Sequence, residues 1–101
     1  MGLLHFLFGN NNKTITDFKN RGAIIIDVRS TNEYSQGAIL NSENIPLPNI
    51  ESKIDYLKSL NKPIITCCAS GVRSGKAAKI LKAHHIETVN GGGWASLQNK
   101  L

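Results

Sequence analysis

The fold of this chain is decided by residues 63–74, PIITCCASGVRS. The apolar run at its start predicts a strand from Pro63 to Thr66 or Cys67, and a helical pattern begins at about Val72. A strand therefore feeds a cysteine into a tight, glycine-containing loop that is closed by the N-terminus of a helix. The backbone N–H groups of such a loop can hold a negatively charged sulfur together with an anionic substrate.

A second continuous apolar run, residues 23–26, predicts another strand that is covered on both faces. This strand delivers Asp27, Val28 and Arg29 to its C-terminal end. Strands that alternate with helical patterns predict an α/β layer with a mostly parallel sheet flanked by helices. Because ligands bind at the C-terminal ends of the strands in such sheets, we expect Asp27, Arg29 and the cysteine loop to lie at one edge.

The remaining expected elements rest on capping signals and on the spacing of apolar residues. In the first half of the chain we expect a short helix capped by Thr16 that ends before Gly22, a capping box over residues 30–33, a brief strand over 37–40 and an extended link over 44–46. In the second half we expect a helix over 50–60, the helix after the loop, a short strand over 87–89, a flexible turn over Gly91–Gly93 and a final helix over 94–100.

A single domain is expected from the length of 101 residues, which is near the most common domain size. We place it at residues 14–101, after an N-terminal arm and linker of residues 1–13. Lys and Arg together number 12 against 7 for Asp and Glu, but the basic residues are spread along the chain and aromatic residues are few. Nucleic acid is therefore not an expected partner, whereas a modest positive field suits small anions.

The apolar start of the chain and its two cysteines bear on where the protein works. Residues 1–8, MGLLHFLF, carry no basic region and no small-residue cleavage site, and they are too short to span a bilayer. We expect no export signal and no firm membrane anchor, and an arm that packs against the domain or frays. Adjacent cysteines rarely meet disulfide geometry, so free thiols in a reducing compartment, the cytoplasm, are expected.

The chemistry of the loop depends on a thiolate, because the thiolate is the nucleophilic form of cysteine. An unperturbed pKa of about 8.5 falls to roughly 3.5 to 7.5 beside cations or at a helix N-terminus, and this loop supplies both. Gly71 permits the turn that lets successive N–H groups converge, and Arg73 adds a planar positive charge. Four residues separate Cys68 from Arg73, and five separate Cys67 from it. The second spacing formally satisfies the signature of cysteine-dependent phosphatases.

The chain resembles a single-domain rhodanese, a sulfurtransferase module, in the order and spacing of several short motifs. They are Ile26-Asp27-Val28-Arg29, Glu33-Tyr34, Gly37-Ala38-Ile39, Asn44-Ile45-Pro46, the run from Cys68 to Ser74, and Gly92-Gly93-Trp94. Each motif is weak alone, but their joint order along so short a chain is specific. The resemblance covers residues 14–101 and implies a rhodanese-like three-layer domain, with a mostly parallel central sheet flanked by helices.

The resemblance also implies which residues do the chemistry. In this family the loop cysteine followed by four residues and an arginine accepts the sulfur, which places that role on Cys68. The Cys68 thiolate would attack the outer sulfur of a donor such as thiosulfate, hold it as a persulfide, and pass it to cyanide, a thiol or a protein cysteine. Asp27 and Arg29 would support the loop from the adjacent strand end, and neither a metal nor an organic cofactor is implied. The substrate-binding amides are those of Ala69, Ser70, Gly71, Val72 and Arg73.

Two departures from the family pattern bear on the substrate. Ala38 stands where many members carry His, and Ala69 stands where many carry Arg, so the loop has a weaker positive field for thiosulfate. Another sulfur donor is therefore an alternative. Two other functions also stay open: a non-catalytic module that delivers or senses sulfur, and a phosphatase that uses Cys67. In the sulfurtransferase interpretation Cys67 is a packing residue at the end of the strand.

Overall fold

The computed structural model describes residues 11–101, so most of the expected N-terminal arm lies outside the described residues. Its centre is a four-stranded sheet in which each strand is parallel to its neighbours. The strands, in their order across the sheet, are β2 (Glu43–Asn44), β1 (Ile24–Asp27), β3 (Ile64–Cys68) and β4 (Thr88–Gly93). The predicted α/β architecture with a mostly parallel sheet is confirmed.

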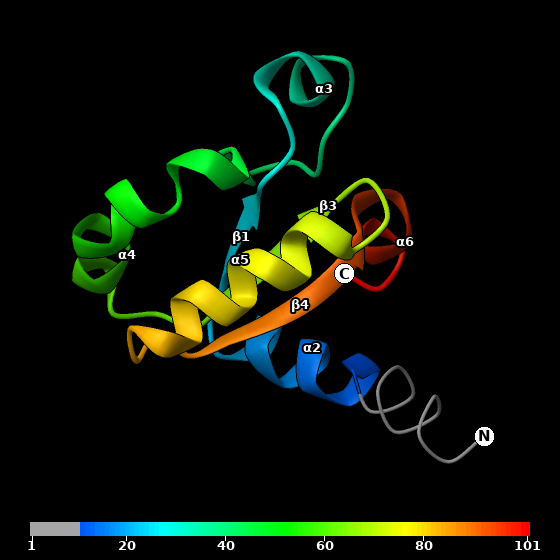
Figure 1. The fold of residues 1–101 in the computed structure, drawn as a ribbon. Coiled ribbons are helices and arrows are strands. Elements are labelled where there is room, and N and C mark those ends of the chain that lie inside the picture. Colours follow the sequence, from blue (N-terminus) through cyan, green and yellow to red (C-terminus); the bar gives the residue numbers. More distant parts are fainter. Residues whose placement is uncertain (1–10) are drawn as a thin grey trace.

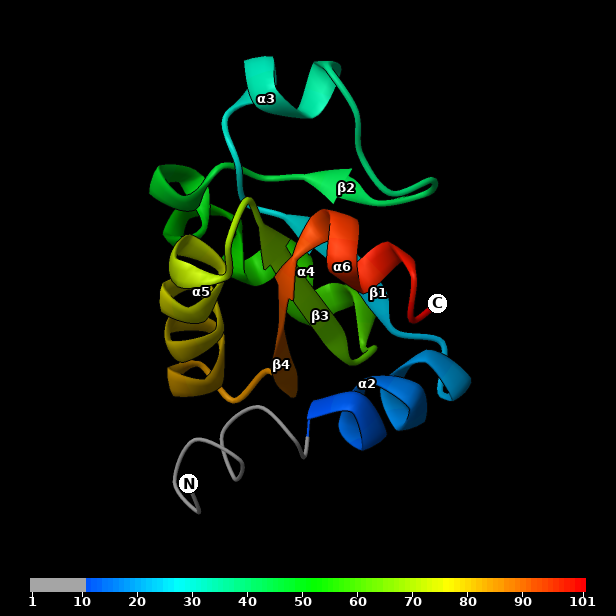
Figure 2. The ribbon, with the colours of Figure 1, turned by 90° about the vertical axis from the view of Figure 1, so that its right-hand side faces the viewer.

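Helices cover both faces of the sheet, which gives three layers (Figures 1 and 2). On one face lie α4 (Ile54–Leu60) and α5 (Val72–Ala83), and on the other lie α2 (Asn11–Asn20) and α6 (Trp94–Gln98). The buried core is split in the same way: Cys68 belongs to the cluster under α4 and α5, and Cys67 belongs to the cluster under α2 and α6. No helix within residues 11–101 has the length and apolarity needed to cross a membrane.

Strand β3 is buried along its whole length, and its side chains alternate between the two core clusters, as they must in an extended strand. Ile64 and Cys68 share the α5 side, whereas Ile65 and Cys67 share the α2 side. The strand runs through Cys68, past its predicted end at Thr66 or Cys67, because β4 still pairs with it there: Cys68 is opposite Gly93, whereas the pairing with β1 ends at Cys67. The predicted start of the following helix at Val72 is confirmed.

Helix α2 extends further toward the N-terminus than predicted. Within the described residues it begins at Asn11, and Thr16 lies inside it rather than capping it; the Thr16 hydroxyl donates to a backbone carbonyl one turn earlier. The Asn-rich start favoured a linker by intrinsic preference, but Ile15 and Phe18 are buried against the sheet. Tertiary packing of an apolar face outweighs propensity. The predicted end before Gly22 is confirmed.

Between β1 and β2 the chain leaves the body of the domain and forms α3 (Thr31–Ser35), which projects at the top of Figures 1 and 2. The predicted capping box is confirmed: the Glu33 N–H donates to Ser30 Oγ at 3.2 Å, and the Ser30 N–H donates to the Glu33 carboxylate at 3.1 Å. Residues 37–40 do not form the predicted strand. The Gly37 carbonyl instead accepts a hydrogen bond from the Arg29 guanidinium at 2.7 Å, so a side chain holds this backbone in place of a neighbouring strand.

The prediction of one helix over residues 50–60 is wrong for the first part of that range. Two short 3₁₀ helices, η1 (Leu47–Asn49) and η2 (Glu51–Lys53), precede α4. Ile50, Ile54 and Leu57 are nevertheless all buried, because residues three or four apart fall on one side in both kinds of helix. Asn61 ends α4 in the left-handed conformation with a φ of 52°, where the helix was predicted to stop.

The glycines at 91–93 belong to β4 and do not form the predicted flexible turn. A Cβ on Gly91 would lie 2.8 Å from side-chain atoms of Ile65 and Leu97, and one on Gly93 would lie 2.8 Å from the Ala69 carbonyl oxygen. Close approach of the backbone, rather than flexibility, therefore requires glycine at these two positions.

The register between β3 and β4 shifts at this point. Thr66 is opposite Asn90, but Cys68 is opposite Gly93, so β4 carries one extra residue. Such a bulge bends a strand and redirects its side chains. Here it brings the β4 backbone against the loop that follows Cys68.

Candidate active site

The Cys68 sulfur lies at the C-terminal end of β3, where the loop of residues 69–71 leads into α5. The donor groups around it include the Gly71 N–H at 3.0 Å, the Ser74 N–H at 3.4 Å and the Ser74 hydroxyl at 3.3 Å. Gly71 has a φ of 99°, a conformation that other residues rarely adopt. This turn directs its N–H at the sulfur. Cys68 itself keeps only 1% of its surface exposed, so the groups that contact its sulfur decide its charge.

The pKa of the Cys68 thiol reflects a competition between burial and hydrogen bonding. Burial alone would raise it, but the Ser74 hydroxyl and the N–H groups of Ser74, Ser70 and Gly71 stabilise the thiolate. These hydrogen bonds outweigh burial, and the pKa of Cys68 is lowered from its ordinary value. The positive N-terminal end of α5 acts in the same direction. The surroundings of the loop therefore favour the thiolate form of Cys68 over the thiol.

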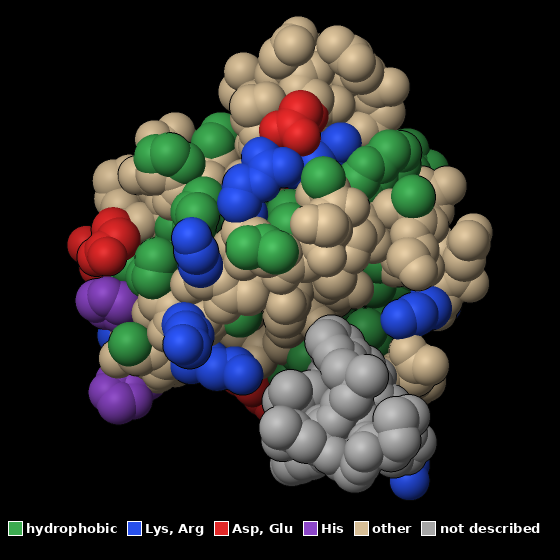
Figure 3. Space-filling model, turned by 45° about the vertical axis from the view of Figure 1, so that its right-hand side comes forward, with side chains coloured by type: hydrophobic (Ala, Val, Ile, Leu, Met, Phe, Trp, Pro, Cys, Tyr) green, Lys and Arg blue, Asp and Glu red, His purple; other side chains and the backbone are tan. Residues whose placement is uncertain are grey.

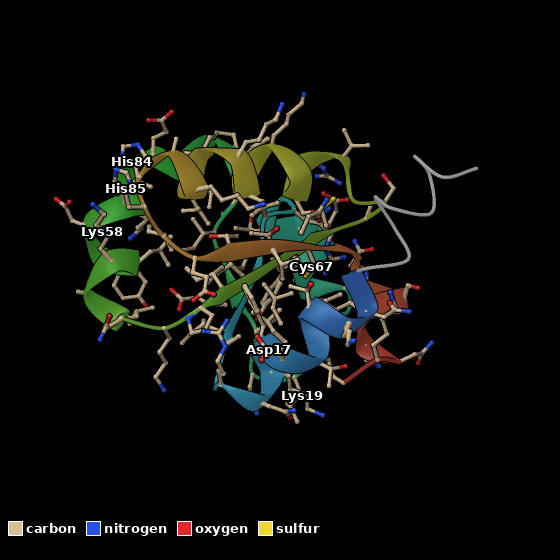
Figure 4. The ribbon with its side chains drawn as sticks, turned by 90° about the horizontal axis from the view of Figure 1, so that it is seen from below. Asp17, Lys19, Lys58, Cys67, His84 and His85 are labelled. Atoms are coloured by element: carbon tan, nitrogen blue, oxygen red, sulfur yellow. The ribbon has the colours of Figure 1, made fainter. Side chains whose placement is uncertain are left out.

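Cys67 meets the opposite conditions on the other side of the strand. It is fully buried in the cluster under α2 and α6. Burial and then the negative charge of Asp27 raise the pKa of Cys67 to about 12. Figure 4 shows Cys67 in the interior, while Lys58, His84 and His85 lie together at an outer edge. Both cysteines are free thiols, and their surroundings shift the two pKa values in opposite directions, down for Cys68 and up for Cys67.

Ser74 and Asn90 complete the site, although the sequence did not single out either of them. Ser74 Oγ lies 2.7 Å from Asn90 Oδ1 and 3.3 Å from the Cys68 sulfur. A serine hydroxyl has one proton to donate; it can donate to Asn90 while Cys68 is a thiol and turn to the sulfur when Cys68 ionises. Asn90 also donates to the Gly71 carbonyl at 3.0 Å, which fixes the loop.

Two signals could have revealed these residues. Ser74 closes the loop motif that was quoted for the resemblance, and Asn90 directly follows the predicted strand at 87–89. A polar residue at the C-terminal end of a strand lies at the ligand-binding edge of a parallel sheet. The missing information was that β4 is the neighbour of β3, which the sheet order supplies.

Arg73, expected to bind substrate, is already paired with an acidic side chain. Its guanidinium donates to the two carboxylate oxygens of Glu33 at 2.8 and 3.1 Å. Both side chains are partly exposed, at 37% for Arg73 and 38% for Glu33. Bonds from Arg73 first, and then from Ser30, lower the pKa of Glu33 to about 2. In Figure 3 acidic and basic side chains lie directly against each other below the projecting top of the molecule.

Asp27 and Arg29 form a buried ion pair, 2.7 Å between Arg29 Nη2 and Asp27 Oδ2. The sequence predicted that this pair would support the cysteine loop, and the side-chain contacts of Arg29 lead to the α3 segment and to α6. The Arg29 side chain also donates to the carbonyls of Gly37 and Glu33, and its guanidinium stacks 4.8 Å from the Trp94 ring centre. The pair therefore holds the α3 segment and α6, and it reaches Arg73 through Glu33.

Two cavities lie at opposite ends of the sheet. One, of about 410 Å³, flanks the cysteine loop between Ser70, Gly71 and the end of the chain at Ser96 and Lys100. The other, of about 290 Å³, lies at the N-terminal ends of β3 and β4 and is mostly lined by polar residues. Within residues 11–101, no three His, Cys, Asp or Glu side chains are grouped so as to hold a metal ion.

The sequence and the structure of this chain are both similar to those of known proteins. The family model for the rhodanese-like domain matches residues 11–100. The uncharacterized protein YqhL of Bacillus subtilis (strain 168) is 38% identical over 74 residues, which cover 69% of this chain and 58% of that protein. A putative mitochondrial thiosulfate sulfurtransferase of Schizosaccharomyces pombe is 29% identical over 96 residues, or 81% of this chain and 68% of the other. The solved structure of a rhodanese with anions from E. coli is 29% identical, with a TM-score of 0.67, and covers 73% of this chain and 89% of that one.

Proposed function

The chain belongs to the rhodanese-like domain family, and from this premise we propose that it is a sulfurtransferase that carries sulfane sulfur on Cys68. The proposal is supported by the likeness to a putative sulfurtransferase and to a rhodanese. The observation that carries it is the convergence of the Gly71 N–H, the Ser74 N–H and the Ser74 hydroxyl on one sulfur atom. These donors keep Cys68 available as a thiolate, which is the form that attacks a sulfur donor.

In the first half-reaction the Cys68 thiolate attacks the outer sulfur of a small anionic donor. With thiosulfate, a new sulfur–sulfur bond forms to Cys68, the sulfur–sulfur bond of the donor breaks, and sulfite leaves with the bonding electron pair. The N–H groups of the loop then face the added sulfur, whose negative charge they stabilise as an oxyanion hole does. Covalent transfer replaces one difficult exchange by two easier ones.

In the second half-reaction an acceptor, cyanide, a thiol or a protein cysteine, attacks the outer sulfur of the persulfide. The bond to Cys68 breaks, and Cys68 leaves as a thiolate with the electron pair. A thiol with a lowered pKa is a better leaving group, so the hydrogen bonds that activate Cys68 for attack also favour its release. The Ser74 hydroxyl can follow this change because it can donate to the thiolate or to Asn90.

Intact-mass measurement after incubation with thiosulfate and removal of the donor tests this function. We expect the wild type and Cys67→Ser to gain one sulfur atom that cyanide then removes, and we expect Cys68→Ser to gain none. Cys67→Ser is the matched control, because it makes the same substitution at the neighbouring position. Sulfur uptake by Cys68→Ser would contradict the assignment of Cys68.

A sulfur-relay module without appreciable turnover is the second candidate. The pairing of Arg73 with Glu33 favours it, because this pair reduces the positive charge that would draw in a free anionic donor. The two candidates differ in steady-state rate. The relay function would be supported if the persulfide passed its sulfur to a partner protein's cysteine while turnover with cyanide or small thiols was negligible.

A phosphatase that uses Cys67 finds no support in the geometry. Cys67 is fully buried on the α2 side of the sheet, and its pKa of about 12 keeps it a neutral thiol. The loop N–H groups meanwhile converge on Cys68. We therefore do not expect aryl-phosphate hydrolysis that depends on Cys67.

A further inference from the structure

One side chain carries all the positive charge that the cysteine loop's own residues supply. Residues 69–73, ASGVR, contain Arg73 as their single charged residue. Its two Nη atoms each donate to a different carboxylate oxygen of Glu33, at 2.8 and 3.1 Å. This bidentate geometry is the strongest form of an arginine–carboxylate pair. The charge of Arg73 is therefore balanced before any substrate arrives.

Glu33 is held in place by its own helix. The Ser30 N–H and the Ser30 hydroxyl donate to Glu33 Oε1 at 3.1 and 3.0 Å. The Glu33 carbonyl accepts a bond from Arg29, a residue that is itself anchored to buried Asp27. Hydrogen bonds from Arg73 and Ser30 lower the pKa of this carboxyl to about 2, so it stays negative throughout the physiological range. A fixed negative charge thus stands next to the first turn of α5.

We propose, resting on the sulfurtransferase function above, that Glu33 is a specificity-determining residue that neutralises Arg73 and so selects a sulfur donor with at most one negative charge near the transferred sulfur. Organic persulfides and thiosulfonates belong to this class and should transfer sulfur faster than thiosulfate, which is a dianion. The Cys68 thiolate repels a dianion more strongly than a monoanion. Arg73, which interacts electrostatically with Cys68, offsets less of this repulsion when Glu33 balances its charge. Discrimination by repulsion is a common route to specificity.

The same bonds change with each of these donors. The Cys68 thiolate bonds to the outer sulfur of an organic persulfide, the donor's sulfur–sulfur bond breaks, and the organic thiolate leaves with the electron pair while the hydrogen stays on the transferred sulfur. With methanethiosulfonate the leaving group is methanesulfinate, and with thiosulfate it is sulfite. Methanethiosulfonate is thus thiosulfate with one charged oxygen replaced by a methyl group, which makes the two a matched pair of probes.

Lys100 is the other cation to consider near the loop. It lines the groove beside Ser70 and Gly71, but it is exposed and lies beyond α6. If an anionic donor bound to Lys100, its reaction with Cys68 would slow in Lys100→Met. The pairing of Arg73 with Glu33 would then not affect the rate. The two sources of positive charge can therefore be separated by mutation.

The experiment measures the second-order rate of sulfur uptake by Cys68 from thiosulfate and from methanethiosulfonate, for the wild type and for Glu33→Gln. Glutamine also serves at this position of a capping box, so α3 is kept while the charge is removed. We expect the thiosulfate rate to rise about tenfold and the methanethiosulfonate rate to rise about threefold or less, because the dianion carries twice the charge. Glu51→Gln, which removes an exposed acid in η2, should change neither rate.

Adding Arg73→Gln to Glu33→Gln should return the donor preference to that of the wild type, because the gain acts through Arg73. High ionic strength should reduce the difference between the donors. If Glu33→Gln takes up sulfur with an unchanged donor ratio, or if Lys100→Met alone removes the thiosulfate reaction, the inference is wrong and the sulfurtransferase function stands. If the wild type takes sulfur from neither donor, the proposed function fails as well.

Discussion

Cys67 and Cys68 are neighbours in β3, but they enter opposite faces of the sheet. On the face of α2 and α6, Cys67 is surrounded by apolar side chains and by Asp27, and its pKa is raised to about 12. On the face of α5, Cys68 receives hydrogen bonds from Gly71 and Ser74, and its pKa is lowered. The residue type is the same and the chain positions are adjacent. The difference comes from which face supplies hydrogen-bond donors, and it can be tested on each face separately.

The largest expected effect is in the reactivity of the two thiols toward iodoacetamide. Raising a thiol pKa from its ordinary value to about 12 lowers its thiolate fraction at neutral pH about a thousandfold, so Cys68 should be labelled at least that much faster than Cys67. The Cys68 rate should reach its plateau at a more acidic pH than that of an unstructured cysteine. Mass mapping of the labelled peptides across pH measures both. Equal labelling rates of Cys67 and Cys68 in the folded protein would contradict the difference between their pKa values.

On the side of the sheet that holds Cys67, we expect substitutions to lower the free energy of unfolding. Gly91→Ala places a Cβ 2.8 Å from Ile65 and Leu97 side-chain atoms on that face, and overpacking of this kind costs about 3 kcal/mol. Gly92→Ala is the comparison: nothing lies within 4 Å of its Cβ, so only its positive φ is strained, at about 1 kcal/mol. Urea unfolding gives both values. The folded Gly91→Ala protein should still label at Cys68, and equal losses in the two variants would argue against close packing at Gly91.

On the side of the sheet that holds Cys68, we expect a substitution to change the labelling rate of the Cys68 thiol. Ser74→Ala removes the hydroxyl that lies 3.3 Å from the sulfur and leaves the N–H groups in place. The loss of one hydrogen bond to a charged group should slow Cys68 labelling at neutral pH about tenfold and move its pH profile toward alkaline values. Ser59→Ala, at an exposed position in α4, is the control. A normal labelling rate in Ser74→Ala would mean that the backbone N–H groups alone stabilise the thiolate.

The parts of the fold that could be predicted from sequence are those encoded by short segments. Strands β1 and β3 are continuous apolar runs, the capping box needs only Ser30 and Glu33, and the start of α5 follows from the loop before it. Cys68 could be distinguished from Cys67 only through the family resemblance. The structure gives the physical reason, since side chains alternate along a strand and one face alone carries the donors.

The parts that could not be predicted depend on residues distant in sequence. Glu33 and Arg73 are 40 residues apart, and Asn90 meets Ser74 across 16. The glycines at 91–93 looked like a turn because glycine often marks one. Glycine is needed at 91 and 93 because Ile65, Leu97 and the Ala69 carbonyl occupy the space that a side chain would need. Packing of this kind is visible only once the sheet order is known.

The alternation of side chains along β3 also sets how long a transferred sulfur would remain on the protein. The chain has two cysteines, and because they point to opposite faces of β3, Cys67 is not placed to attack a persulfide on Cys68 or to close a disulfide with it. A loaded sulfur would therefore have no internal route of discharge. Its residence time would depend on the concentration of outside acceptors, so that the domain could store sulfur between the arrival of a donor and the arrival of a recipient.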